Sequence, residues 1–148
     1  MPVRRIEPAA DYARLFEQVR GRLAGDAALR SQSFARFQEL GFPNQRAEAW
    51  KYTSLKSLAE NAPAAPAPVA VGLADLEPYL VTGDVKRLVF VNGFLAAELS
   101  EIDDLPAGLT VATFDERVSH EGALLADATA ERSLTALNAA LAHGGAVV

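Results

Sequence analysis

The chain has 148 residues, of which 50% are hydrophobic and 22% are charged, a length and composition suited to one domain with its own core. It carries 14 basic and 19 acidic residues, and no basic stripe stands out, which argues against a nucleic-acid-binding surface. It contains no cysteine, which excludes disulfides and thiolate ligands for zinc or an iron–sulfur cluster.

Two helices are predicted in the first forty residues. Apolar side chains recur at helical spacing over residues 8–23, and Gly25 is predicted to end this helix. Its expected buried stripe consists of Tyr12, Leu15, Phe16, Val19 and Leu23. Asp26 can cap a second helix over residues 27–40, whose arginines, like those of the first helix, are spaced as solvated charges. The expected buried side of the second helix consists of Leu29, Phe34, Phe37 and Leu40.

The segment Gly41–Leu58 has the least ordinary sequence of the chain, GFPNQRAEAWKYTSLKSL, and contains the only tryptophan. Asn44 can cap a short helix over residues 45–50. Thr53 or Ser54 can start a further short helical turn. Its mixture of aromatic and charged residues makes this segment the first place to look for a site.

Two interpretations of this segment are open. In the preferred one, Trp50, Phe42 and Tyr52 form a local aromatic cluster. Arg46 and Glu48 would then make hydrogen bonds or an ion pair beside the cluster. In the other, the segment is a recognition surface, because Trp, Tyr and Arg dominate interface hot spots. Replacing Trp50 by alanine separates the two, since loss of a core residue lowers stability whereas loss of an interface residue lowers binding.

Residues 61–72 read NAPAAPAPVAVG and are predicted to form an extended linker, because three prolines among alanines cannot hold a helix. The linker separates a helical region over residues 1–60 from a second region over residues 73–148. A short helical turn is expected near residues 73–80. The rest of the second region is predicted to hold a hairpin followed by helices.

The clearest strand signal is residues 87–91, followed by Asn92 and Gly93, which favour a type I′ turn because both positions accept positive φ. Residues 94–99 are predicted to be the return strand, and residues 109–114 a third strand. A two-stranded hairpin alone is marginal in water, so we expect it to pack on helices or to join a larger sheet.

Two further helices are predicted over residues 115–126, where Gly122 weakens the pattern, and over residues 131–142. The buried face of the second is expected to hold three leucines, Leu134, Leu137 and Leu141. The closing residues 146–148 read Ala-Val-Val, which is typical of the opening of a strand.

No catalytic or metal-binding constellation is found in the sequence. Ser119 and His120 are adjacent, but neighbours in sequence point apart on most backbones, which disfavours a serine hydrolase. Glu101, Asp103 and Asp104 follow the hairpin, where solvated acids are usual. We therefore expect no enzyme activity and no cofactor or metal ion bound by this chain.

The start of the chain lacks a basic segment followed by an apolar run, and no stretch approaches the ~20 apolar residues of a membrane helix. We therefore expect a cytoplasmic protein with neither a membrane nor a nucleic acid as its partner.

Residues 41–55 resemble the amino-terminal signature of the SufB/SufD family, in the form carried by its SufD type. The matching positions are Phe42, Pro43, Arg46, Glu48, Trp50, Lys51, Tyr52, Thr53 and Leu55. Two later stretches agree with the resemblance. Residues 88–93 resemble the hairpin that family members carry next, and residues 136–148 resemble the segment that leads into their β-helix.

The resemblance implies the amino-terminal portion of a scaffold component in the SUF iron–sulfur cluster assembly complex. It implies SufB-like and SufC-like ATPase subunits as partners of the full-length protein, and an iron–sulfur cluster that belongs to the full complex. The implied fold is α+β, a mostly helical amino-terminal domain with a small antiparallel sheet, ending before an expected parallel β-helix.

The chain is accordingly expected to be a fragment whose signature residues serve structure or interaction and not chemistry. A hypothesis from another class stays beside this one. In that hypothesis the chain is a standalone protein-binding module that uses the aromatic face around Trp50.

Overall fold

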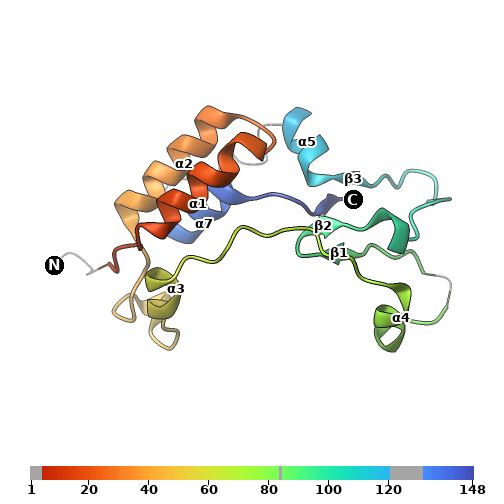
Figure 1. Ribbon diagram of the computed structural model, residues 1–148, viewed down its shortest axis with the longest axis horizontal. Helices are drawn as coiled ribbons and strands as arrows, with labels where there is room; N and C mark the ends of the chain where they lie inside the picture. The colour runs from red at the N-terminus through yellow and green to blue at the C-terminus, as the bar shows by residue number, and fades with distance from the viewer. Residues whose placement is uncertain (1–4, 84, 121–131) are drawn as a thin grey trace. The chain divides into compact units, whose positions relative to one another are not determined.

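Figure 1 shows the computed structural model of the chain, which describes residues 5–83, 85–120 and 132–148. These residues form short helices and two antiparallel sheets of two strands each, so the predicted α+β class is confirmed. None of the described helices is long and apolar enough to span a bilayer.

The chain divides into two compact units, each made of two stretches of sequence. The helical unit comprises Met1–Ala65 and Val118–Ala142, and the sheet unit comprises Pro66–Arg117 and His143–Val148. The first boundary between them falls inside residues 61–72, which contain neither helix nor strand. The division of the chain at this linker into two consecutive regions stays a prediction.

The helical unit begins with two helices, and the ends of the second follow the predicted signals. The first ends before Gly25, its predicted terminator, because the chain is already extended at Leu23. The predicted residues 8–23 form α1 (Asp11–Val19) and a 3-10 turn, η1 (Arg20–Arg22). Asp26 caps α2 (Ala27–Leu40), since its carboxylate accepts hydrogen bonds from the first N–H groups of that helix. Gly41 ends α2 at a φ of 61°, a conformation that favours glycine.

Three further elements of the helical unit follow along the chain. They are the 3-10 turn η2 (Glu48–Trp50), α3 (Lys56–Glu60) and α7 (Ser133–Leu141). The N-terminal part of the predicted helix over 115–126 is α5 (Phe114–His120), whereas its remainder with Gly122 lies outside the described residues.

Aromatic rings from three elements form the core of the helical unit. The Phe16 ring of α1 stacks on Phe34 of α2 with centroids 4.4 Å apart, and Phe37 meets Phe42 edge-on at 5.2 Å. Tyr12 completes the cluster beside Phe37 and Phe42. Ring pairs of this kind add about 0.5–1.5 kcal/mol beyond the area that they bury.

The buried face of α7 differs from the prediction. Its fully buried residues are Ala136, Ala139 and Ala140, whereas Leu134, Leu137 and Leu141 are only partly buried around the core. Small side chains let the axis of α7 approach α2 closely, and the leucines then fill the space at the sides of the contact.

The prediction that the arginines of the first helices are all solvated is wrong for Arg30 of α2, which is 1% exposed. Its Nε donates to the carbonyl of Ala24 at 2.7 Å, and its Nη1 donates to the carbonyls of Ala139 and Ala140 at 3.3 Å. These two carbonyls lie in the last turn of α7, where a cation is favoured by the helix dipole. Arg30 is buried because it satisfies that helix end.

The sheet unit opens with α4 (Leu73–Leu76) and the 3-10 turn η3 (Glu77–Tyr79), in the region where a helical turn was expected. The predicted hairpin follows as β1 (Phe90–Val91) and β2 (Phe94–Leu95), with Phe90 opposite Leu95. Asn92 and Gly93 both have positive φ, so the predicted type I′ turn is confirmed.

Both strands of the hairpin are shorter than predicted. The 3-10 turn η4 (Ala97–Leu99) replaces the end of the return strand. The N–H of Val89 donates to the hydroxyl of Ser100 at 3.0 Å, so a side chain takes the place of a ladder carbonyl. Pairing resumes as a single bridge between Arg87 and Glu101.

The second sheet joins the end of the chain to the predicted third strand. The strand expected over residues 109–114 is formed only at β3 (Ala112–Thr113), which pairs with β4 (Ala146–Val147). The strand character of the last residues is thereby confirmed. Just before β4, the N–H of Gly145 donates to the carbonyl of Gly93 at 3.1 Å, which holds the strand against the hairpin turn.

Candidate functional site

The signature segment of residues 41–58 is fixed to the core of the helical unit at both ends. Phe42 is 0% exposed, and its N–H and C=O exchange hydrogen bonds of 2.9 and 3.0 Å with Ile6. At the other end, the phenol of Tyr12 donates to the carbonyl of Leu58 at 2.6 Å. Burial raises the pKa of the Tyr12 phenol, which keeps the phenol protonated as the donor of that bond.

The predicted aromatic cluster of Phe42, Trp50 and Tyr52 does not form. Phe42 packs in the core, Trp50 is half-buried, and Tyr52 is 89% exposed, with the Lys51 ammonium 5.4 Å from the centroid of its ring. The 3-10 turn η2 ends at Trp50, and the chain turns again directly after it. Residues close in sequence therefore separate into core and solvent.

The predicted pairing of Arg46 with Glu48 is also absent among the residues that the structure describes, and both are exposed. The predicted short helix over residues 45–50 is formed only as η2, whose N-cap residue Ala47 makes no side-chain capping bond, so Asn44 is not its cap. Asn44 closes a turn instead, because its side-chain oxygen accepts from the N–H of Arg46 at 2.9 Å. The N–H of Thr53 donates to the carbonyl of Trp50 at 3.0 Å, which closes the following turn.

The signature thus has three kinds of position. Phe42 and Leu55 pack on the core, and Pro43 and Trp50 line a pocket. The remaining five are exposed and lie on the turns between them: Arg46, Glu48, Lys51, Tyr52 and Thr53. Most of the signature is therefore available to a partner, and its core positions hold the exposed ones in place.

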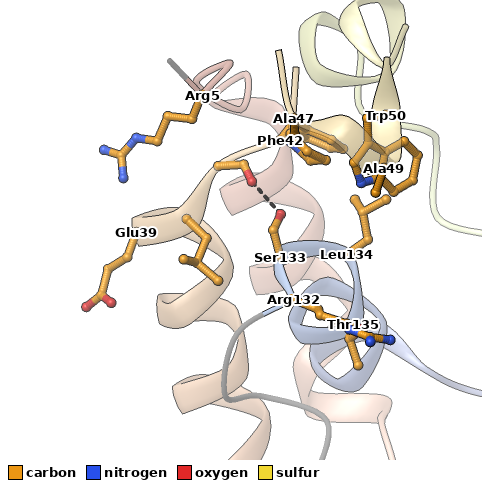
Figure 2. A pocket seen from close by; sticks show the side chains of 13 residues that line it. Arg5, Glu39, Phe42, Ala47, Ala49, Trp50, Arg132, Ser133, Leu134 and Thr135 are labelled. Carbon is orange, nitrogen blue, oxygen red and sulfur yellow. Dashed lines mark hydrogen bonds between the residues drawn. The ribbon is translucent and has the colours of Figure 1, made fainter. Parts of the chain in front are cut away.

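A pocket with a volume of about 1020 Å³ lies next to Trp50 in the helical unit. We call it the Trp50 pocket. It is lined by Arg5, Glu39, Leu40, Gly41, Phe42, Pro43, Ala47, Ala49, Trp50, Arg132, Ser133, Leu134 and Thr135. Figure 2 shows the Trp50 ring facing Leu134 of α7, while Arg5 and Glu39 extend outward.

One hydrogen bond joins the two sides of the Trp50 pocket. The hydroxyl of Ser133, the first residue of α7, donates to the carbonyl of Gly41 at the end of α2. These residues are 92 positions apart in the sequence. No local pattern indicates that the start of α7 lies beside the signature, so Arg132, Ser133 and Leu134 were not among the predicted site residues.

The charged residues at the pocket rim differ in whether they form ion pairs. Arg5 forms an ion pair with Glu7 at 2.9 Å, and the Glu39 carboxylate forms one with Arg36 at 3.0 Å. Arg132 is exposed and makes no ion pair with any of the residues that the structure describes. The rim therefore presents a cation next to an apolar wall.

The acidic residues that follow the hairpin make separate contacts and do not assemble into a site. Glu101 forms an ion pair with Arg87 at 2.9 Å, and the carbonyl of Asp103 accepts from Lys86. The side chain of His120 lies outside the described residues. Within the described ranges, no group of three or more His, Cys, Asp or Glu residues could hold a metal ion. The described site is thus suited to binding and shows no acid–base pair.

Comparison with known proteins covers nearly the whole chain. Residues 6–148 match the family described as SufBD protein N-terminal region. An iron–sulfur cluster assembly SufBD family protein of Synechocystis sp. is 35% identical over 89 residues, which are 60% of this chain and 20% of that protein. The chain therefore corresponds to a small part of this relative. No solved structure matches the chain.

Proposed function

Because the chain belongs to the SufB/SufD family through its N-terminal region, we propose that it serves iron–sulfur cluster assembly as a structural and interaction domain of a SufD-type scaffold protein. The match over residues 6–148 carries the proposal, and the name of the Synechocystis relative supports the process. The SufD type is the finer part of the proposal. It rests on the form of the signature between Phe42 and Leu55.

We further propose that the chemistry lies outside this chain. A chain without cysteine offers no thiolate to a cluster, and the described signature residues divide between core and surface positions. In this role the domain has no enzyme activity and no cofactor of its own. It works in the cytoplasm beside SufB-like and SufC-like ATPase subunits, through the protein to which it belongs.

A deletion and complementation experiment tests the role in cluster assembly. The gene that encodes the chain is deleted in its host, and the activity of a [4Fe–4S] dehydratase is measured together with that of a zinc enzyme as control. We expect the dehydratase alone to lose activity and the intact gene to restore it. Unchanged dehydratase activity under iron limitation would contradict the role.

The proposed partners are tested separately by reconstitution. The gene product is co-expressed with the SufB-like and SufC-like subunits of the same host, and the mixture is separated by size-exclusion chromatography with light scattering. A stable complex with both subunits is expected. Separate elution of all three proteins would leave the process intact but remove the scaffold assignment.

A second candidate is a protein-binding module that acts outside cluster assembly through the face around Trp50. The exposure of Tyr52 and the half-burial of Trp50 in a pocket favour it, because aromatic side chains of this kind anchor interfaces. Normal cluster enzymes in the deletion strain, together with a partner lost on substitution of Tyr52, would favour this candidate over the first.

A further inference from the structure

We propose that the Trp50 pocket binds a short acidic segment of a partner protein, in which a carboxylate lies beside a large apolar side chain. The inference names the partner chemistry of one surface of the domain and rests on the interaction role proposed above. It is carried by three features of the described residues: the apolar wall, the cation at its edge and the charge of the signature segment.

The apolar part of the pocket can accept a large side chain. Trp50, Leu134 and Pro43 come from the signature segment and from α7, and they line a volume of about 1020 Å³. Pockets that hold organic ligands span about 300–1,000 Å³, so this one has room for more than one side chain. A half-buried tryptophan loses little conformational freedom on binding, which makes Trp50 a suitable anchor.

The charge at the pocket selects an acidic occupant. Arg132 lies at the N-cap of α7, where the partial positive charge of the helix end has the same sign as the guanidinium. The one carboxylate in the lining, that of Glu39, is already compensated by Arg36. A carboxylate placed at this edge would therefore be attracted by both the side chain and the helix end.

The signature segment extends the same charge beyond the pocket. Residues 41–58 carry three cations, Arg46, Lys51 and Lys56, against the single anion Glu48, although the whole chain has a net charge of -5. Lys56 is paired with Glu60 at 3.7 Å, so Arg46 and Lys51 supply the excess positive charge of the segment. A cationic stretch on an acidic protein steers an acidic partner to this face and disfavours basic ones. Charge complementarity thus points to an acidic segment as the occupant.

Peptide selection with the purified chain tests the proposal. A phage-displayed library of random nonapeptides is selected on the chain and, in parallel, on an Arg132→Glu variant. We expect enriched peptides to carry Asp or Glu next to Leu, Ile or Phe on the native chain and to lose this enrichment on the variant. Enrichment of basic peptides, or no enrichment at all, would overturn the proposal.

Binding of the enriched peptides is then followed by the fluorescence of Trp50, the only tryptophan of the chain. We expect saturable shifts with a dissociation constant on the order of 10 μM, weakened about tenfold by Arg132→Glu and by raised salt. Arg22→Glu is the matched control, because Arg22 is an exposed arginine of the helical unit outside the pocket lining. Equal losses of peptide affinity in both variants would show a general effect of charge and would overturn the proposal.

The alternative occupant of the pocket is a second copy of the chain, and a separate measurement tests for it. Sedimentation measures the association state of the native chain and of a Trp50→Phe variant, which retains an aromatic ring. Self-association that the variant weakens would assign the pocket to a second copy and overturn the proposal. Failure of the cluster-assembly role is distinguishable, because peptide binding is measured on the purified chain and the dehydratase is measured in cells.

Discussion

The two units of the chain are stabilised in opposite ways. In the helical unit, large aromatic side chains from α1, α2 and the signature segment fill one core. In the sheet unit, the contacts depend on the absence of side chains: a Cβ on Gly144 would lie 1.9 Å from the carbonyl oxygen of Gly93. Side-chain volume therefore specifies the helical unit, whereas close backbone approach specifies the contact of β4 with the hairpin turn in the sheet unit.

The largest loss of stability is expected when side-chain volume is removed from the core of the helical unit. Phe37 is fully buried between Tyr12, Phe34 and Phe42, so Phe37→Ala should lower the free energy of unfolding by about 3–5 kcal/mol. Urea denaturation followed by circular dichroism measures this loss. Val69→Ala serves as control, because Val69 is largely exposed and should change stability by less than about 0.5 kcal/mol. Similar losses of stability in Phe37→Ala and Val69→Ala would contradict the role of side-chain volume in the helical unit.

The next largest loss of stability is expected when a buried polar contact of the helical unit is removed. Arg30→Ala leaves the carbonyls of Ala139 and Ala140 without their buried donor, and should lower the free energy of unfolding by about 2–3 kcal/mol. The same denaturation measures it. Arg36→Ala is the control, since Arg36 lies nearer the surface of the same helix. A loss for Arg30→Ala no larger than the control would show that this contact adds no stability.

The addition of a single methyl group should destabilise the sheet unit. Gly144→Ala places a methyl group against the Gly93 carbonyl at a φ of 67°, which should destabilise the pairing of β3 with β4 by about 1–3 kcal/mol. Amide hydrogen exchange at Ala112 and Val147 measures this. Gly21→Ala is the matched control, because a Cβ there meets nothing within 4 Å. Unchanged protection in Gly144→Ala would refute the role of backbone approach.

Alkaline pH should weaken the helical unit through Tyr12. Burial raises its pKa above 10.0, so the neutral phenol contributes stability that is fully present below pH 10.0 and is lost as the pH rises through the raised pKa. The free energy of unfolding should therefore fall above this pH more steeply in the native chain than in Tyr12→Phe. Urea titrations at several pH values measure both slopes, and identical slopes would exclude Tyr12 as the cause.

The smallest stability effect is expected at the exposed end of the signature. Tyr52→Ala should change the free energy of unfolding by less than about 0.5 kcal/mol, because Tyr52 is 89% exposed and its ring interacts with the likewise exposed Lys51 ammonium at 5.4 Å. Thermal unfolding measures it. A loss comparable to that of Phe37→Ala would place Tyr52 in the core and restore the predicted aromatic cluster.

The sequence alone determined the features that depend on neighbouring residues. The cap at Asp26, the helix end at Gly41 and the type I′ turn at Asn92–Gly93 were all predicted and are all present. Each is decided by backbone preferences within a few positions, so the sequence contains the whole cause. The family resemblance of residues 41–55 is likewise a local pattern, and the match over residues 6–148 confirms the SufB/SufD family.

Periodicity predicted most of the buried side of α1 and part of that of α2, although Leu23, Leu29 and Leu40 are only half-buried. Only the tertiary structure decided what meets each element and which side of α7 is buried. Periodicity favoured the leucines of α7, but the close approach to α2 buries the alanines, and Arg30 is buried because it reaches the end of α7. The Trp50 pocket is lined by residues far apart in the sequence, such as Gly41 and Ser133, which are 92 positions apart and share a hydrogen bond. Contacts of this kind follow from the packing of whole helices, which no local pattern of residues encodes.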